Sequence, residues 1–288
     1  MRRALVVVNK KARRGGGPVA DALAALREGG IEPVEREVFS PGDLPRLIAH
    51  MKADVDLVVL GGGDGTMSTA APGLLESGLP LGILPLGTAN DLAHTLGLPL
   101  DPVEAARVVV AGRTERIDLG RVNDSYFFNV AHLGLSVTLT NQLTPAAKRM
   151  FGKLSYAYCA LKVIARARRF AAELTCDEET VLARTIQIAI GNGKFYGGGN
   201  AVAADAAIDD GHFDVYSLEP RNPWRVVPML PWFRRGTHGT WSEVRTLRCR
   251  RLTIRTRRPR SITTDGEITT ATPAEFEVLN GAVTVFVP

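Results

Sequence analysis

A glycine-rich turn with one acid and one hydroxyl follows an apolar run in the first third of the chain. The run DVDLVVL spans residues 54–60, and GGGDGT follows it at residues 61–66. Glycines at the end of a buried strand leave room for a phosphate close to the backbone, and the first amides of the next helix can donate to it. No lysine follows, so the turn differs from the lysine-containing phosphate loop. The pattern predicts a phosphate-binding turn.

A second turn of similar composition follows the next apolar run. LPLGTAND spans residues 84–91 and again places a glycine and a threonine where a helix should begin. Either turn, taken alone, could need glycine only for its backbone conformation. Two such turns at one edge of a sheet favour a site for the phosphates of a nucleotide.

Oxygen-bearing residues gather at three further places in the chain. GNGKFYGGG spans residues 191–199, Asp209-Asp210-Gly211 follows it, and Asp265-Gly266-Glu267 lies near the C-terminus. Each of the two acidic segments could be an ordinary turn between strands. The clustered oxygens of the Asp-Asp-Gly loop could also bind a hard cation such as Mg²⁺.

Strand and helix signals alternate through residues 1–116. Apolar runs predict strands at 4–8, 34–40, 55–60 and 81–84, and helical spacing of apolar residues predicts helices at 18–29, 43–51, 66–77 and from Asn90 onward. This alternation predicts a doubly wound parallel sheet covered on both faces. Ligands of such folds bind at the carboxyl ends of the strands, where both glycine turns fall.

The pattern changes from about Arg116 onward. Short β-rich segments, separated by turn signals such as Asn280-Gly281, predict a mostly antiparallel domain over residues 117–288. One helical insertion is expected near residues 145–170. The chain of 288 residues is long for one hydrophobic core, which also favours two domains.

The charge of the chain is positive and unevenly distributed. The net charge is +5 and the pI is about 9.3, with basic tracts at residues 145–170 and 221–260. Basic surfaces attract phosphate-bearing partners. The basic segment at 145–170 could be a packed helix with a solvated face. Aromatic residues in the second tract (Trp224, Trp232 and Phe233) favour an anionic membrane surface, and no recognisable module favours nucleic acid. No apolar run reaches the length of a spanning helix. We therefore expect a cytoplasmic protein peripherally associated with the inner face of the membrane.

GGGDGT, PLGTAND, GNGKFYGGG, the Asp-Asp-Gly loop and the late Asp-Gly-Glu occur in this order over nearly the whole chain. In this combination the chain resembles the diacylglycerol kinase catalytic family, and within it the bacterial lipid kinases. The resemblance implies an α/β plus β fold. It comprises an N-terminal nucleotide-binding domain similar to that of NAD kinases and phosphofructokinases, a C-terminal β-sandwich, and an active site in the cleft between them. It also implies ATP- and Mg²⁺-dependent phosphorylation of a hydroxyl of diacylglycerol or a related lipid.

The resemblance also implies roles for individual residues. Glu267 matches the proposed general base, and Asp118 matches an acid placed in the magnesium and water network. The loop from Ala207 to His212 matches a metal site built largely from backbone carbonyls, with Asp210 as the side-chain ligand. Nucleotide contacts are expected at Ser40, Gly62, Gly63, Asp64, Gly65, Thr66 and Thr88.

One departure from the family pattern lies directly after the first glycine turn. Ser68-Thr69 stands where the family usually has Asn-Glu. Two alternatives to a lipid kinase stay open from the sequence: an NAD kinase, and a catalytically weak homologue that binds nucleotide or lipid. The PLGTAND form and the late Asp-Gly-Glu weigh against the NAD kinase, whereas the Ser68-Thr69 departure is what favours the weak homologue.

Overall fold

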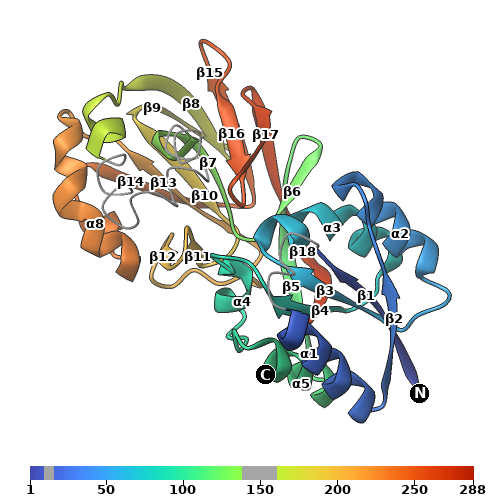
Figure 1. The fold of residues 1–288 in the computed structure, drawn as a ribbon. Helices are drawn as coiled ribbons and strands as arrows, with labels where there is room; N and C mark the ends of the chain where they lie inside the picture. Colours follow the sequence, from blue (N-terminus) through green and yellow to red (C-terminus); the bar gives the residue numbers. More distant parts are fainter. Residues whose placement is uncertain (10–15, 138–160) are drawn as a thin grey trace.

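The computed structural model describes residues 1–9, 16–137 and 161–288. Its first domain is built on a parallel sheet with the strand order β2-β1-β3-β4. The strands are β1 (Arg2–Val8), β2 (Ile31–Arg36), β3 (Leu57–Gly62) and β4 (Leu81–Pro85). Figure 1 shows this domain at the lower right, with both chain ends in it.

Helices cover both faces of the parallel sheet because side chains alternate along its strands. Leu5 and Val7 of β1 pack in one core with α2 (Leu44–Met51) and α3 (Asp64–Ser77). Ala4 and Val6 pack in a second core with α1 (Gly16–Glu28) and α5 (Pro102–Ala111). The short helix α4 (Asp91–Thr95) lies between β4 and α5 in the chain. The predicted doubly wound domain is thereby confirmed.

The second domain is a sandwich of two sheets. A six-stranded antiparallel sheet has the order β14-β13-β10-β7-β16-β17. Its strands are β7 (Val130–Gly134), β10 (Gln187–Gly191), β13 (Phe213–Leu218), β14 (Val244–Cys249), β16 (Ser261–Thr264) and β17 (Glu267–Ala271). Facing it are β5 (Thr114–Val122), β6 (Ser125–Phe127), β8 (Phe170–Cys176), β9 (Glu179–Thr185), β15 (Arg251–Thr256) and β18 (Ala274–Phe286). Leu133, Ile188 and Phe213 of the first sheet share one buried core with Leu174 and Phe276 of the second.

Strand β18 joins the two domains. Its first half pairs with β15 on one side and with β5 on the other. Its second half continues to pair with β5 and also pairs, at Val285 and Leu81, with β4. The sheet of the first domain therefore continues into the sandwich. The Asn280-Gly281 pair, predicted to be a turn between strands, is instead an irregularity within β18, where the register shifts between Leu279 and Val283. Gly281 adopts a φ of 52°, which glycine tolerates and which lets the strand bulge.

The boundaries of other elements differ from the predictions by a few residues. β2 begins at Ile31 and ends at Arg36, earlier than the predicted 34–40, and α3 begins at Asp64 instead of Thr66. Most of the predicted insertion at 145–170 lies outside the described residues; within it, residues 161–165 are helical and β8 begins at Phe170. Among the described residues, no helix is long and apolar enough to cross a bilayer.

Candidate active site

Both glycine turns lie at the carboxyl edge of the parallel sheet, and they contact each other through their backbones. The amide of Leu86 donates to the carbonyl of Gly62 at 2.9 Å. The carboxylate of Asp64 accepts a hydrogen bond from the amide of Leu92 at 2.9 Å, so the first turn also holds the start of α4. Asn90 closes the second turn by accepting from the Gly87 amide at 2.9 Å. The two turns thus form one rigid surface.

Packing between the two turns requires their glycines. A Cβ atom on Gly63 would lie 3.0 Å from the Cα atom of Gly87, and one on Gly87 would lie 2.5 Å from the Cα atom of Gly63. The φ of Gly63 is −107°, so no left-handed conformation is involved. A Cβ on Gly62 would meet Thr66 Oγ1 at 2.4 Å. Contacts within the protein, as well as space for a ligand, therefore set the composition of the turns.

We expect Gly87→Ala to destabilise the protein and to weaken nucleotide binding. The added methyl group would meet the Gly63 backbone at 2.5 Å and Asn90 Oδ1 at 2.7 Å. The Gly63 backbone has no side chain that can move aside, and overpacking of this kind costs about 1–3 kcal/mol of the free energy of unfolding. Gly17→Ala is the matched control, because no described residue lies within 4 Å of its Cβ position. Denaturant titration and calorimetry with ATP measure both effects. Equal stability of the two variants would contradict the close packing of the turns.

The sandwich domain contributes Glu267 to the same surface. Glu267 is the first residue of β17, and its Oε1 atom lies 2.7 Å from the position that a Cβ on Gly65 would occupy. Its side chain therefore covers the start of α3, where the helix leaves its first amides without partners inside the helix. In the described part of the chain, the Glu267 carboxylate makes no hydrogen bond or ion pair. This is the position expected for a group that acts on a ligand bound at the turn.

Asp265, two residues earlier, ties the turn before β17 to the start of β7 and to helix α3 of the first domain. Its carboxylate accepts hydrogen bonds from the amides of Phe128, Asn129 and Val130 at 2.8 to 3.0 Å, and from Ser68 Oγ at 2.6 Å. Asp265 is partly exposed, but its carboxyl group is enclosed, and this burial raises its pKa to about 6 while the hydrogen bonds oppose the shift. Ser68, the first residue of the Ser68-Thr69 departure, therefore has Asp265 as its partner. This hydrogen bond fixes the segment that carries Glu267.

The loop that contains GNGKFYGGG reaches across to the second glycine turn. The amide of Gly198, which has a φ of 78°, donates to the carboxylate of Asp91 at 2.9 Å. Burial raises the pKa of Asp91, and the nearby Asp64 carboxylate raises it further, whereas the amides of Gly198 and Gly197 lower it. Asp64 and Asp91 are therefore a pair of acids close enough to repel each other.

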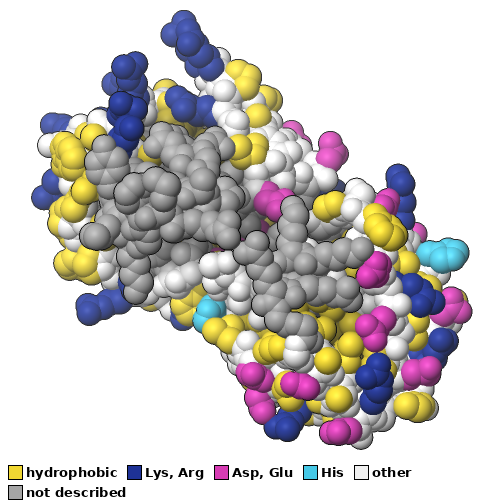
Figure 2. Space-filling view, viewed as in Figure 1, with side chains coloured by type: hydrophobic (Ala, Val, Ile, Leu, Met, Phe, Trp, Pro, Cys, Tyr) yellow, Lys and Arg dark blue, Asp and Glu magenta, His cyan; other side chains and the backbone are white. Residues whose placement is uncertain are grey.

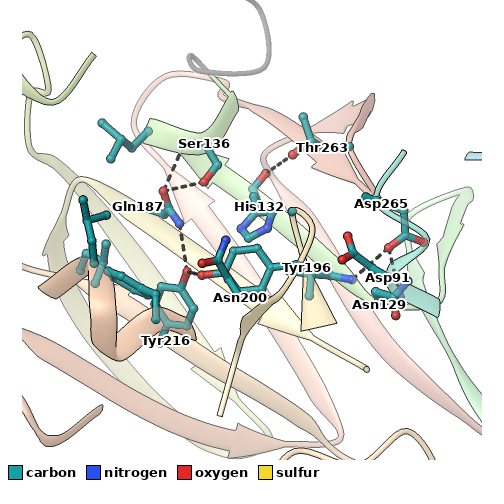
Figure 3. A pocket seen from close by; sticks show the side chains of 18 of the residues that line it. Asp91, Asn129, His132, Ser136, Gln187, Tyr196, Asn200, Tyr216, Thr263 and Asp265 are labelled. Carbon is teal, nitrogen blue, oxygen red and sulfur yellow. Dashed lines mark hydrogen bonds between the residues drawn. The ribbon is translucent and has the colours of Figure 1, made fainter. Parts of the chain in front are cut away.

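A cavity of about 340 Å³ opens beside these acids and extends into the sandwich. Figure 3 shows Asp91, Asn129 and Asp265 at one side of it and Ser136, Gln187 and Tyr216 at the other. Its inner part is lined by Leu135, Val163, Ile164, Leu218, Val226, Leu230 and Phe233. No lysine or arginine is among the described residues that line it. The arrangement suits a ligand with a polar end at the turns and a hydrocarbon part within the sandwich.

A magnesium ion fits the acids at the mouth of the cavity. The described residues contain no cluster of three or more His, Cys, Asp or Glu side chains that could hold a metal ion. Mg²⁺, however, commonly binds through one or two carboxylates and the phosphates of its substrate while retaining several waters. Asp64 and Asp91 offer such a pair, and a cation would relieve the repulsion that contributes to the raised pKa of Asp91.

Asp118 is placed as a structural residue. It is 2% exposed, and its two carboxylate oxygens accept hydrogen bonds at 2.6 Å from the amides of Gly281 and Gly211. It thereby ties the Asp-Asp-Gly loop to the bulge in β18, and it is not among the residues that line the cavity. Each carboxylate oxygen thus has one backbone donor, and the place of Asp118 in a magnesium and water network stays a prediction.

In the predicted metal loop, Ala207 to His212, both carboxylate oxygens of Asp210 have protein partners. Asp210 forms an ion pair with Arg248 at 2.6 Å and accepts from the His212 amide at 2.9 Å. The His212 ring lies 2.7 Å from the Asp210 carbonyl oxygen. A site for a cation at the backbone carbonyls of this loop stays a prediction.

The remaining predicted nucleotide residues lie at or near the carboxyl edge of the sheet. Thr66 Oγ1 accepts a hydrogen bond from Asn9 at 3.4 Å, and Thr88 is exposed in the second turn. Ser40 is exposed and precedes the 3₁₀ turn Pro41–Asp43. The sequence reasoning did not single out Asp91, Asp265, Asn129 or His132. Asp91 and Asp265 belong to motifs that it did identify, whereas no motif distinguishes Asn129 and His132.

Comparison with known proteins agrees with this architecture. Residues 3–122 match the diacylglycerol kinase catalytic domain, and residues 130–287 match the YegS C-terminal NAD kinase beta sandwich-like domain. Fold and site thus define a two-domain kinase. A protein named "Diacylglycerol kinase" from Mycobacterium tuberculosis is 32% identical over 276 residues, which cover 93% of this chain and 88% of that protein. A protein named "Probable lipid kinase YegS-like" from Pseudomonas aeruginosa is 32% identical over 288 residues, 99% of this chain and 93% of that protein. The chain belongs to the diacylglycerol kinase family of lipid kinases.

A solved structure supports the fold independently. The crystal structure of a diacylglycerol kinase from Bacillus anthracis superposes with a TM-score of 0.78 at 20% sequence identity, and the match covers 100% of this chain and 97% of that one. At this level of identity the likeness concerns the fold alone.

Proposed function

We propose that the protein transfers the γ-phosphoryl group of ATP to a hydroxyl of diacylglycerol or a closely related lipid. One observation carries the proposal: Glu267 of the sandwich lies over Gly65 at the start of α3, beside the mouth of an apolar cavity. A phosphate-binding helix end, a carboxylate and a hydrocarbon pocket are the three parts that such a transfer needs.

Each part of the site has a physical role in this proposal. The first amides of α3 donate to the nucleotide phosphates, with the helix dipole favouring their negative charge. Glu267 accepts the proton of the lipid hydroxyl as it attacks, and Asp265 and Ser68 position the strand that carries it. Mg²⁺, when bound near Asp64 and Asp91, supplies positive charge that offsets the charge of the transferring group. The apolar cavity holds the hydrocarbon part of the acceptor.

A radiolabelled-ATP assay over a panel of acceptors tests the proposal. The panel contains short-chain diacylglycerol, ceramide, sphingosine and NAD, each with Mg²⁺ and with excess EDTA. We expect label in a lipid product only when Mg²⁺ is present. Label in NAD would favour the NAD kinase alternative, and nucleotide binding without any labelled product would favour the catalytically weak homologue.

We also propose that helix α8 (Val226–Arg235) faces an anionic membrane surface. Trp224, Leu230 and Trp232 are exposed on or next to this helix, and Arg234 and Arg235 end it. Figure 2 shows hydrophobic side chains gathered at the left edge of the molecule, over α8, with Lys and Arg side chains around them. Leu230 also lines the cavity, so this surface adjoins the proposed lipid pocket.

Replacing Arg234 and Arg235 with glutamine should weaken sedimentation with anionic vesicles by about tenfold or more at low salt, since each basic residue near the surface contributes about 1 kcal/mol. Turnover of a water-soluble short-chain lipid should be unchanged. The control variant replaces Arg36 and Arg46, which are exposed in the first domain. Equal loss of vesicle binding in both variants would show that net charge, and not α8, determines binding.

A further inference from the structure

His132 is a buried polar side chain that lacks a partner in the wall of the cavity. It lies in β7, is 7% exposed, and is among the residues that line the cavity. Its Nδ1 atom has no hydrogen-bond partner, and the described residues provide none for its Nε2 atom either. Burying a polar atom without a partner is costly, so such groups in native proteins usually meet a ligand or a water.

The strand places His132 at a defined distance from the mouth of the cavity. Side chains alternate along β7, so Val130 and His132 face the cavity while Ala131 and Leu133 pack in the core of the sandwich. The amide of Val130 donates to Asp265, which marks the acidic end. His132 lies about 6–7 Å farther along the strand, because each residue advances about 3.3 Å. In Figure 3 it lies between the acids and the Gln187-Tyr216 pair.

The surroundings of His132 indicate which kind of ligand group it can bind. Its ring contacts that of Tyr196 edge-on with 4.9 Å between centroids, and burial lowers its pKa to about 4, so it is neutral at pH 7. A neutral imidazole offers one N–H donor and one acceptor nitrogen. No cationic side chain is among the described residues that line the cavity, whereas three acids lie at its mouth, which disfavours an anionic group on the acceptor.

Beyond His132 the wall becomes hydrocarbon. Leu135, Val163, Ile164 and Leu218 line this part. Three polar groups share it and bond to one another: Gln187 donates to Tyr216 at 3.1 Å and accepts from Ser136 Oγ at 2.7 Å. The partner of His132 must therefore be the last polar group of the ligand before its hydrocarbon chain begins. In an acylated lipid that group is the carbonyl of the acyl linkage.

We infer that His132 is a specificity-determining residue that donates a hydrogen bond to the acyl carbonyl oxygen of the acceptor lipid, next to the hydroxyl that is phosphorylated. The inference rests on the proposed function for the placement of the lipid in this cavity. It adds that the enzyme distinguishes acyl-linked from alkyl-linked lipids through this one side chain. Both an ester and an amide linkage contain this carbonyl, so His132 could bind the acyl group of either kind of lipid.

The test compares three short-chain acceptors of similar hydrocarbon content: dioctanoylglycerol, its dialkyl ether analogue and a short-chain ceramide. Binding by calorimetry and kcat/KM are measured for the wild type, His132→Leu and Ile164→Val. In His132→Leu the loss of one hydrogen bond should lower the affinity and the kcat/KM for the ester lipid about three- to tenfold. Both values for the ether lipid should stay unchanged. A parallel loss for ceramide identifies the amide as a second source of the carbonyl. Ile164→Val should lower the affinity for all three lipids by the same factor, since it removes only an apolar contact.

His132→Asn provides the second variant, because its amide keeps a donor and should restore part of the preference for the ester. An unchanged ester-to-ether ratio in a folded His132 variant would overturn the inference while leaving the kinase proposal in place. If the wild type labels no lipid, the proposed function fails, but the calorimetric ester-to-ether ratio still tests His132. Absence of measurable binding of every lipid to the wild type would overturn both.

Discussion

Glu267→Gln is expected to lower kcat by about 10²–10⁴-fold, the contribution typical of a positioned general base. Glutamine keeps the shape of the side chain, but it cannot take a proton from the lipid hydroxyl at neutral pH. The KM for ATP should stay within a few-fold of the wild-type value, because the proposed phosphate contacts are made by backbone amides and not by Glu267. The melting temperature should not change, since the described residues give the Glu267 carboxylate no hydrogen bond or ion pair to lose.

Glu275→Gln is the matched control for this measurement. Glu275 is also an exposed glutamate on a strand of the sandwich. Its backbone amide donates to Asn123, in the turn between β5 and β6 and not in the glycine turns. It should leave kcat unchanged. A Glu267→Gln protein with wild-type kcat and melting temperature would remove Glu267 from the mechanism. A lowered melting temperature with unchanged kcat would identify the Asp-Gly-Glu segment as a structural turn only.

Asp265→Ala is expected to lower both stability and kcat. The substitution leaves three backbone amides and the Ser68 hydroxyl without their shared acceptor. Because hydrogen bonds to a charged group are strong and water reaches part of this residue, we expect a loss of about 2–4 kcal/mol. For a chain of this size the melting temperature should fall by about 3–7 °C. The kcat should fall with it, because the strand that carries Glu267 loses its anchor on the first domain.

Asp177→Ala separates the role of Asp265 from the general effect of removing a turn aspartate. Asp177 has a similar backbone conformation, with a φ of 52° against 45° for Asp265, and it accepts hydrogen bonds from the amides of Arg250 and Arg251. It is exposed and lies in the turn between β8 and β9. We expect a smaller loss of stability and an unchanged kcat. If both variants lose the same stability and both keep kcat, Asp265 does not position Glu267.

The hydrogen bond from Ser68 to Asp265 bears on the departure from the family pattern. The resemblance placed Ser68-Thr69 where Asn-Glu is usual, which favoured a weakened homologue. In the folded protein Ser68 Oγ lies 2.6 Å from Asp265, and Thr69 Oγ1 donates to the carbonyl of Gly65 at 2.7 Å. Both hydroxyls therefore support the segments on which the proposed chemistry depends. We expect Ser68→Ala to reproduce part of the effect of Asp265→Ala.

Local patterns were sufficient to predict one half of the site. Parallel strands covered on both faces appear in the sequence as short apolar runs that alternate with helical periodicity, and their carboxyl ends must share one edge. The runs at 55–60 and 81–84 therefore predict that GGGDGT and PLGTAND lie side by side. The prediction of a β-rich second domain rested on equally local signals of short strands and turns.

Contacts between distant segments decided the other half. Glu267 meets Gly65, Asp265 meets Ser68 and Gly198 meets Asp91 because the sandwich packs against the turns in one orientation. Asn280-Gly281 carries the signature of a turn, yet the pairing of β18 with strands of both domains makes it a bulge. His132 occupies a strand position like any other in the sequence. Only the pairing of β7 with β10 and β16 turns it toward a cavity, because strand alternation fixes which residues share a face but tertiary packing fixes what that face meets.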